Sequence, residues 1–161
     1  MQEMHIYGVS FDLVGKQPIV LLKTAEGNKF LPIWIGHPEA AAILMKLQSA
    51  TTPRPMTHDL VTDLLEQLGA QVIRITVTEL RENTFYAQIT VQLDGSEIEV
   101  DSRPSDAIAL AIRADAPISR SSWLISSRSS SRARRSTRRI SSARCPTSAP
   151  SSTTSLQTSS P

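Results

Sequence analysis

Apolar and polar residues alternate along the first part of the chain in the manner of half-buried β-strands. Residues 4–12 alternate, residues 18–23 form a short apolar run, and residues 29–35 alternate again beyond a turn at residues 26–28. Because short runs bounded by turn residues are typical of strands, this region predicts three β-strands.

The pattern then changes to that of helices. Pro38 suits the first position of a helix and Glu39 its first turn, and strong helix formers continue from there to residue 48. A second helix is predicted over residues 57–68, because Gly69 follows it as a C-terminal cap. Two consecutive helices therefore follow the first three strands.

Strands return further along the chain. The strand-like segments are residues 72–77, 84–91 and 97–100. Asp94-Gly95 is a hairpin turn between the last two of them, and a third helix is predicted to begin at Ser105 and to end near residues 113–115. This order of elements predicts an α+β fold in which three helices accompany a mixed or antiparallel sheet.

The composition changes abruptly after Ile118. Residues 119–161 contain seventeen serines, eight arginines and no acidic residue, whereas residues 1–118 carry nine basic and fifteen acidic residues, a net charge of −6. The whole-chain net charge of +2 and the pI of about 9.0 therefore describe the tail rather than the domain. We predict one domain over residues 1–118 and a disordered Ser/Arg-rich tail over residues 119–161, of the kind that binds nucleic acid or is phosphorylated.

A second interpretation of the tail is that it is a frameshift product. Neither the helical nor the strand period survives beyond Ile118. Reverse translation of residues 132–161 with GC-rich codons permits, in another frame, an acidic and helix-compatible sequence without a stop. We therefore favour a frameshift near residue 118, and an intact frame on resequencing of the gene there would restore the Ser/Arg tail.

Composition excludes several classes of protein. No apolar run reaches the ~18 residues of a membrane span, and the first residues lack the charged-then-apolar layout of a signal peptide. The only cysteine, Cys145, lies in the tail, so neither a disulfide nor a thiolate metal cluster is available. We expect a cytoplasmic protein that does not contact membranes.

Two similar segments precede the second and third helices. Each runs from Arg-Pro through a hydroxyl residue to an acid and then to an apolar run. A helix start presents free backbone N–H groups and a partial positive charge, to which Arg54 or Arg103 adds a full one. The two segments therefore predict sites for a phosphate-bearing ligand, with Thr57 and Ser105 beside them, or else simply two well-capped helices.

Three segments in order resemble the bifunctional nuclease (BFN) domain family: Leu31-Pro32-Ile33-Trp34-Ile35-Gly36 with Glu39-Ala40, Arg54-Pro55-Met56-Thr57-His58-Asp59-Leu60, and Asp101-Ser102-Arg103-Pro104-Ser105-Asp106-Ala107-Ile108-Ala109-Leu110. The resemblance covers about residues 4–118. It implies an α+β fold, association into homo-oligomers, and a nuclease activity on both RNA and DNA. It also implies that a further strand and an acidic helical end follow Ile118. This chain departs from the family pattern after Ile118, and the alternate reading frame would restore that pattern.

Asp101 and Asp106 are candidate catalytic acids and metal ligands. Asp101 ends a predicted strand and Asp106 lies in the first turn of the third helix, so both carboxylates are expected to face one pocket. Paired carboxylates hold Mg²⁺ or Mn²⁺ beside a phosphodiester, and Arg103 and Ser105 would bind the phosphate. In the alternative interpretation Asp106 complements the helix dipole, Ser105 caps the helix, and Arg103 pairs with Asp101.

His58 and Glu39 are further candidates. Imidazole is the commonest general acid or base near neutral pH, so His58 is a candidate proton carrier, with Arg54 and Thr57 on the substrate phosphate. The alternative is that His58 and Asp59 are solvent-facing residues of the first helical turn. Glu39 either completes a metal site or complements the dipole of its helix.

Two features weigh against extensive nucleic-acid binding. A domain of net charge −6 has no broad basic stripe and is expected to bind phosphate weakly and locally. Aromatic residues make up only 4% of the chain, and Trp34, between Ile33 and Ile35, is predicted to lie in the core rather than to stack on bases.

We therefore predict a low-specificity nuclease for RNA and DNA, in which Asp101 and Asp106 hold a metal or activate water, His58 moves protons, and Arg54 and Arg103 hold the phosphate. The alternative from a different class is a non-catalytic oligomeric binding module for a small anionic ligand or a partner protein. A third hypothesis makes the tail a nucleic-acid-binding arm, whose binding would depend steeply on salt and would be lost on deletion of residues 119–161.

Overall fold

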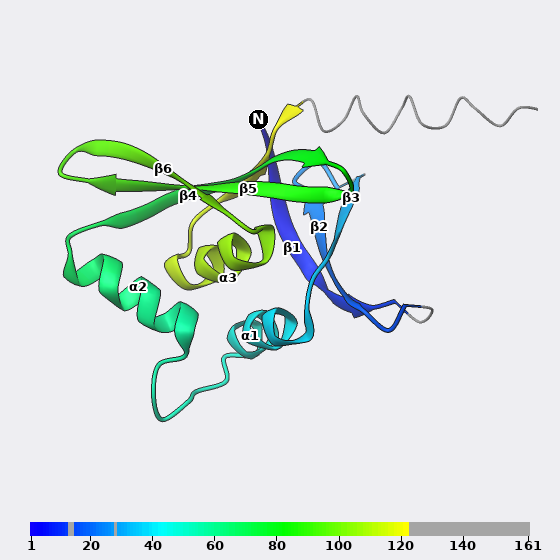
Figure 1. The fold of residues 1–161 in the computed structure, drawn as a ribbon, viewed down its shortest axis with the longest axis horizontal. Helices are drawn as coiled ribbons and strands as arrows, with labels where there is room; N and C mark the ends of the chain where they lie inside the picture. The colour runs from blue at the N-terminus through cyan, green and yellow to red at the C-terminus, as the bar shows by residue number, and fades with distance from the viewer. Residues whose placement is uncertain (13–14, 28, 123–161) are drawn as a thin grey trace, which may run out of the picture.

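The computed structural model describes residues 1–12, 15–27 and 29–122 (Figure 1). In chain order the elements are β1 (Gln2–Phe11), β2 (Pro18–Thr24), β3 (Phe30–Trp34), α1 (His37–Leu47), α2 (Thr57–Gln67), β4 (Gln71–Arg81), β5 (Thr84–Leu93), β6 (Ser96–Ser102), α3 (Pro104–Ala114) and β7 (Ile118–Arg120). The predicted α+β fold with three helices is confirmed. β4 and β6 extend further than their alternating patterns predicted.

The strands form one seven-stranded mixed sheet in the order β3-β2-β1-β7-β4-β5-β6. Every neighbouring pair is antiparallel except β4 and β7, which are parallel. Two tight turns join β4 to β5 and β5 to β6, with positive φ at Glu82 and Asn83 and at Asp94 and Gly95. Turns with two positive φ values match the twist of the flanking strands, which explains the Asp-Gly signal in the sequence.

The three helices lie together on one side of β4, β5 and β6 (Figure 1). α3 contacts both α1 and α2 and packs against β4 and β5. The middle of α3 consists largely of alanine, isoleucine and leucine, and small alanine side chains allow neighbouring elements to approach closely. The consecutive residues Ala107, Ile108, Ala109, Leu110 and Ala111 are all buried, and at about 100° per residue they cover every side of the helix. The central position of α3 places its first turn next to the starts of both other helices.

Strand β7 continues beyond residue 118, where the domain was predicted to end. Ser119 and Arg120, which the composition assigned to the tail, pair with β1 on one side and β4 on the other. Ile118 is buried in the core, and Ser121 N–H donates to Val77 O. A three-residue strand is too short to show a period, so it could not be recognised in the sequence. Residues 123–161, on which the tail and frameshift predictions rest, lie outside the described residues.

Two local predictions were wrong. Helix α3 begins at Pro104, so Ser105 is its second residue and does not cap it. Trp34 is 51% exposed rather than part of the core, because the strand period turns Leu31 and Ile33 inward and Trp34 outward on an edge strand.

None of the helices in the described part of the chain combines the length and the hydropathy that crossing a bilayer requires.

Candidate active site

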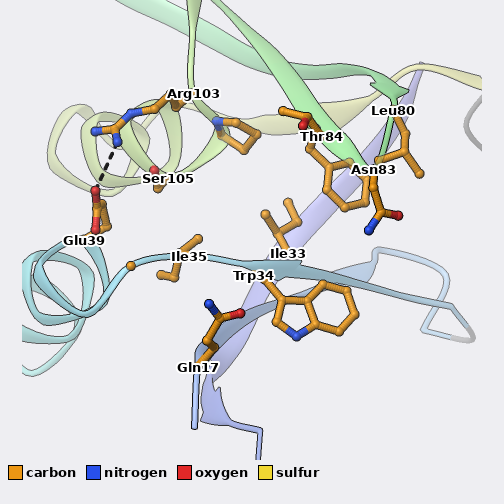
Figure 2. Close-up of a pocket in the computed structure, with 13 residues that line it drawn as sticks. Gln17, Ile33, Trp34, Ile35, Glu39, Leu80, Asn83, Thr84, Arg103 and Ser105 are labelled. Atoms are coloured by element: carbon orange, nitrogen blue, oxygen red, sulfur yellow. Dashed lines mark hydrogen bonds and ion pairs between the residues drawn. The ribbon is translucent and has the colours of Figure 1, made fainter. Parts of the chain in front are cut away.

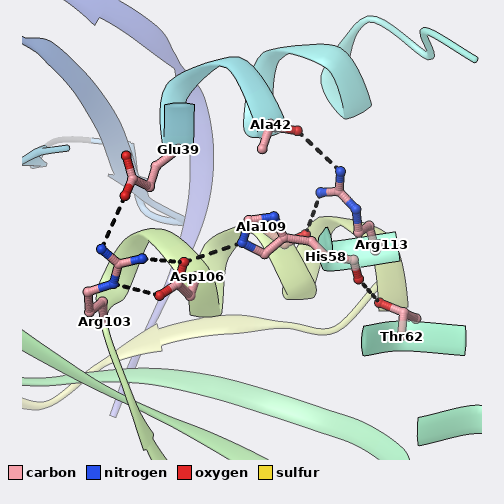
Figure 3. Close-up of polar contacts among 8 residues, drawn as sticks. All are labelled: Glu39, Ala42, His58, Thr62, Arg103, Asp106, Ala109 and Arg113. Carbon is pink, nitrogen blue, oxygen red and sulfur yellow. Dashed lines mark hydrogen bonds and ion pairs between the residues drawn. The ribbon is translucent and has the colours of Figure 1, made fainter. Parts of the chain in front are cut away.

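Three charged side chains and one histidine, from three helices, form one connected cluster (Figure 3). Glu39 comes from the first turn of α1, His58 from the first turn of α2, and Arg103 and Asp106 from the start of α3. All four residues were candidates from the sequence, but they belong to three separate segments of the chain. The packing of α3 against α1 and α2 brings the segments together.

Arg103 is the centre of this cluster. Its Nε donates to Asp106 Oδ2 at 2.7 Å and its Nη2 to Asp106 Oδ1 at 3.1 Å, while Nη1 donates to Glu39 Oε1 at 3.1 Å. Pro104 fixes the first helical position, so Arg103 is the extended N-cap residue and Asp106, three positions on, faces it. The bidentate contact holds the guanidinium in one orientation.

His58 lies on the other side of Asp106. Its Nε2 is 3.3 Å from Asp106 Oδ1, and only 17% of its side chain is exposed. His58 therefore does not face solvent, contrary to the alternative interpretation. Because an ionised carboxylate only accepts hydrogen bonds, His58 Nε2 carries the proton in this contact. The order of contacts is therefore Glu39, Arg103, Asp106 and His58.

The cluster shifts the ionisation of two of its members. Burial would raise the pKa of the Asp106 carboxyl, but the hydrogen bonds from Arg103 and His58 outweigh it, so this pKa is lowered. The hydrogen bond and the charge of Asp106, followed by Glu39, raise the pKa of Arg103. Asp106 and Arg103 therefore remain an ion pair at neutral pH.

A second ion pair joins the same three helices. Arg113 of α3, whose side chain is only 5% exposed, donates through Nε to Asp59 Oδ1, through Nη1 to Ala109 O and through Nη2 to Ala42 O. Burial would raise the pKa of Asp59, but hydrogen bonds from Arg113 and from Met56 N–H lower it. Arg113 was not among the residues predicted from the sequence, although a lone arginine in an Ala/Ile/Leu helix is a visible signal.

A cavity of about 440 Å³ opens beside the cluster (Figure 2). Glu39, Arg103 and Ser105 line one end of it, whereas His58 and Asp106 are not among its lining residues. The remaining walls come from β3 and its junction with α1, from the β4–β5 hairpin, and from the residues at the starts of β2 and α3. They are Gln17, Ile33, Trp34, Ile35, Gly36, Leu80, Asn83, Thr84, Phe85 and Pro104. A ligand in the cavity would thus meet the Glu39–Arg103 pair directly, with Asp106 and His58 behind it.

Three of the predicted site residues lie apart from the cluster. Asp101 is exposed on β6 opposite Gln88, and within the described residues no hydrogen bond or ion pair joins it to Arg103 or Asp106. The interpretation that Arg103 pairs with Asp101 is therefore wrong. Arg54 is exposed, and its carbonyl oxygen accepts a hydrogen bond from the Thr52 hydroxyl. Thr57 is exposed at the first position of α2.

Asp106, one of the two carboxylates predicted to bind a metal ion, is held by Arg103 in this structure. Both Asp106 oxygens accept hydrogen bonds from the Arg103 guanidinium. Among the residues that the structure describes, no group of three or more His, Cys, Asp or Glu side chains is arranged to hold a metal ion. Dependence on Mg²⁺ or Mn²⁺ stays a prediction.

Comparison with known proteins identifies the family of this chain. The sequence model of the bifunctional nuclease domain matches residues 20–132, a range that contains the whole cluster. An uncharacterised protein of Mycobacterium tuberculosis is 42% identical over 118 residues, which cover 73% of this chain and 70% of that protein.

Plant proteins match at lower identity. Bifunctional nuclease 1 of Oryza sativa subsp. japonica is 30% identical over 103 residues, 62% of this chain and 31% of that protein. Bifunctional nuclease 1 of Arabidopsis thaliana is 28% identical over 111 residues, 66% of this chain and 34% of that protein. The matched part of the chain therefore spans about a third of the length of these plant relatives.

Proposed function

Because the chain belongs to the bifunctional nuclease domain family, we propose that it is a nuclease that hydrolyses phosphodiester bonds of RNA and DNA with low specificity. The observation that carries this proposal is the convergence of Glu39, Arg103, Asp106 and His58 from three helices at one end of a cavity. A carboxylate and a guanidinium side by side supply a proton acceptor and an anion-binding group, which phosphodiester hydrolysis requires.

Arg103 and Glu39 would act directly on the substrate. The Arg103 side chain is 68% exposed and lines the cavity, so its guanidinium can bind a phosphate oxygen and stabilise the charge that develops in the transition state. Because DNA has no 2′-hydroxyl, a mechanism shared by both nucleic acids does not use that group, and the proposed nucleophile is water. Glu39 accepts a proton from that water as it attacks phosphorus, the P–O ester bond breaks, and the leaving oxygen is protonated from solvent.

Asp106 and His58 would act through Arg103. Asp106 fixes the guanidinium with two hydrogen bonds, and His58 contacts the same carboxylate from the other side. The structure thus favours His58 as a positioning residue. The pH dependence of activity in His58→Ala distinguishes this positioning role from the sequence-based proposal that His58 carries a proton. If the imidazole ring takes part in the chemistry, the pH profile of the variant differs in shape from that of the wild type.

The electrostatics predict weak substrate binding. Arg103 stands between two carboxylates, and residues 1–118 carry a net charge of −6. Weak and local phosphate binding agrees with low sequence specificity.

The decisive test is hydrolysis of labelled RNA, single-stranded DNA and double-stranded DNA by the full chain, with Mg²⁺, with Mn²⁺ and with a chelator. We expect Glu39→Gln to lower kcat about 100-fold or more, the usual contribution of a general base. Asp106→Asn should lower it as well because Arg103 loses its orientation. The matched control is Asp63→Asn, an exposed acid on α2 outside the cluster, which should keep full activity. Equal residual activity in wild type and in Glu39→Gln would indicate contamination and contradict the proposal.

The activity of Asp101→Asn distinguishes the two-carboxylate site predicted from the sequence from the cluster found in the structure. If the two-carboxylate hypothesis is right, this variant loses activity as completely as Asp106→Asn. If the cluster is the site, Asp101→Asn has a small effect because its side chain lies apart on β6.

The alternative is a non-catalytic oligomeric binding module. It is favoured by exposed apolar side chains at a spacing of four residues along α2: Met56, Leu60, Leu64 and Leu68. Association into homo-oligomers stays a prediction, measurable by sedimentation velocity. An oligomer without hydrolytic activity above a mock preparation would make the binding module the better proposal. The tail-arm hypothesis concerns residues outside the described range and is tested by the salt dependence of nucleic-acid binding with and without residues 119–161.

A further inference from the structure

The cavity beside the charged cluster is larger than a phosphate group needs. Its volume of about 440 Å³ falls within the ~300–1,000 Å³ typical of small-molecule sites. Glu39 and Arg103 lie at one end, and Trp34 and Asn83 lie at the other (Figure 2). A ligand that fills the cavity therefore has an anionic end and a second, chemically different end.

The second end is apolar and aromatic. Trp34 is 51% exposed there, and Leu80 and Phe85 line the same space. The aromatic pairs within the described residues are Tyr7–Phe30 and Phe11–His37, so the Trp34 indole has no ring partner. An exposed indole beside a cavity offers a flat face against which a planar ring can stack.

Hydrogen-bonding groups surround this apolar end. Gln17, Asn83 and Thr84 are exposed and line the cavity, and no hydrogen bond within the described part of the chain uses their side chains. Amide groups both donate and accept, which suits the mixed donors and acceptors on the edge of a nucleobase. Stacking on an aromatic ring with hydrogen bonds to the base edge is how proteins recognise unpaired bases.

We propose that this cavity binds one unpaired nucleobase, stacked on Trp34, while the adjoining phosphate contacts Arg103. A base within a duplex is stacked and paired, so it has to leave the helix before it can enter. The preferred substrate is therefore single-stranded RNA or DNA, or an unpaired position in a duplex. This inference names the substrate class of the same site and, for hydrolysis, rests on the proposed nuclease function.

The base supplies more of the binding than the phosphate does. The Arg103 charge is offset by Glu39 and Asp106, so the anionic end attracts phosphate only weakly. Ribose 5-phosphate should accordingly bind much more weakly than a nucleoside monophosphate, although both carry the same phosphate. Low sequence specificity also follows, because every base has a face that can stack.

Binding is measured by the fluorescence of Trp34 in the full chain carrying Trp123→Phe, which leaves Trp34 as the single tryptophan. AMP and UMP are expected to quench it with saturation, whereas ribose 5-phosphate and inorganic phosphate are not. Equal quenching by ribose 5-phosphate and by the nucleotides, or none by either, would overturn the proposal. This measurement does not require catalysis.

Hydrolysis provides the second measurement. Trp34→Ala should raise KM for a single-stranded oligonucleotide about tenfold with little change in kcat, and Trp34→Phe should restore most of the affinity because a ring remains. Tyr86→Ala is the control, an exposed aromatic on β5 that contacts Arg81 and does not line the cavity. Circular dichroism of each variant shows whether the fold is kept.

The two proposals fail in different ways. Saturable quenching by AMP in a protein without hydrolytic activity supports the base pocket and refutes the nuclease. Hydrolysis that is equally fast on single and double strands, with an unchanged KM in Trp34→Ala, supports the nuclease and refutes the pocket.

Discussion

At the scale of single residues, Asp106 determines how the cluster is held together. It contacts Arg103 through both oxygens and His58 through one, and these hydrogen bonds lower its pKa despite partial burial. A carboxyl whose pKa is lower in the folded state than in the unfolded state stabilises the fold while it is ionised. The same contacts that orient Arg103 therefore contribute to stability.

This predicts a pH-dependent stability difference between wild type and Asp106→Asn. The contribution of Asp106 is fully present above the unfolded-state pKa of about 3.8 and is lost as the pH falls through the lower folded-state value. Wild type should be the more stable protein at neutral pH, and the difference should shrink below about pH 4. Urea unfolding at several pH values measures it. A difference that stays constant down to about pH 2 would show that Asp106 has no lowered pKa.

Asp59 is a second residue whose ion pair contributes to stability, and its role is structural rather than chemical. It is the ionic partner of Arg113, whose guanidinium is buried among the three helices. Asp59→Ala should destabilise the protein by about 2–3 kcal/mol, somewhat below the ~3–5 kcal/mol for a fully buried pair because Asp59 is partly exposed. Asp63→Ala, an exposed acid on the same helix, is the control and should change the free energy of unfolding by less than about 0.5 kcal/mol. Equal effects of the two changes would contradict this role.

At the scale of elements, the β3–α1 junction controls the position of Glu39. Gly36 ends the connection, and a β-carbon built at this residue would collide with the Glu39 carboxylate. Gly36 has φ −77° and ψ 164°, a conformation that any residue adopts, so a larger residue here is opposed by the Glu39 carboxylate and not by the backbone. The junction thus leaves room for the carboxylate that contacts Arg103.

Gly36→Ala is therefore expected to preserve the fold and to displace Glu39. The loss of activity should approach that of Glu39→Gln, with the midpoint of thermal unfolding changed by only about a few degrees. The double variant Gly36→Ala/Glu39→Gln should lose little more than either single variant, because both changes act through the same carboxylate. Additive losses in kcat would mean that Gly36 acts by another route.

At the scale of the whole molecule, β7 connects two parts of the sheet. β3, β2 and β1 lie on one side of it and β4, β5 and β6 on the other, so the chain returns to the centre of the sheet only at Ile118–Arg120. Its backbone bonds to both neighbours complete the central ladder. A short strand from the end of the described chain therefore holds the sheet together.

We predict that a chain ending after Ser122 unfolds cooperatively in urea like the full-length protein, whereas a chain ending after Pro117 does not. Without β7, β1 and β4 expose unpaired backbone groups at the centre of the sheet, and Ile118 leaves the core. Circular dichroism and urea unfolding of both truncated chains provide the measurement. Equal stability of the two would show that β7 is dispensable and that the domain ends at residue 117.

Most of the elements and their order follow from local signals in the sequence. Strand alternation, the Asp94-Gly95 turn, Pro38 at the start of α1 and Gly69 after α2 are all local signals, so they could be read without knowledge of the fold. The segments that identified the family are equally local, and they contain every residue of the cluster. The chemical types in the site were thus predictable from the sequence.

Which of these residues meet depends on the packing of the folded chain. Asp106 contacts His58, which is 48 positions away in the sequence, and Arg103 contacts Glu39 rather than the nearby Asp101. Such contacts depend on how α3 packs between elements that are remote along the chain, and residue patterns report only the local period. The exposure of Trp34, the cavity beside it and the central place of β7 have the same origin. Each is fixed by long-range packing, to which local propensity contributes almost nothing.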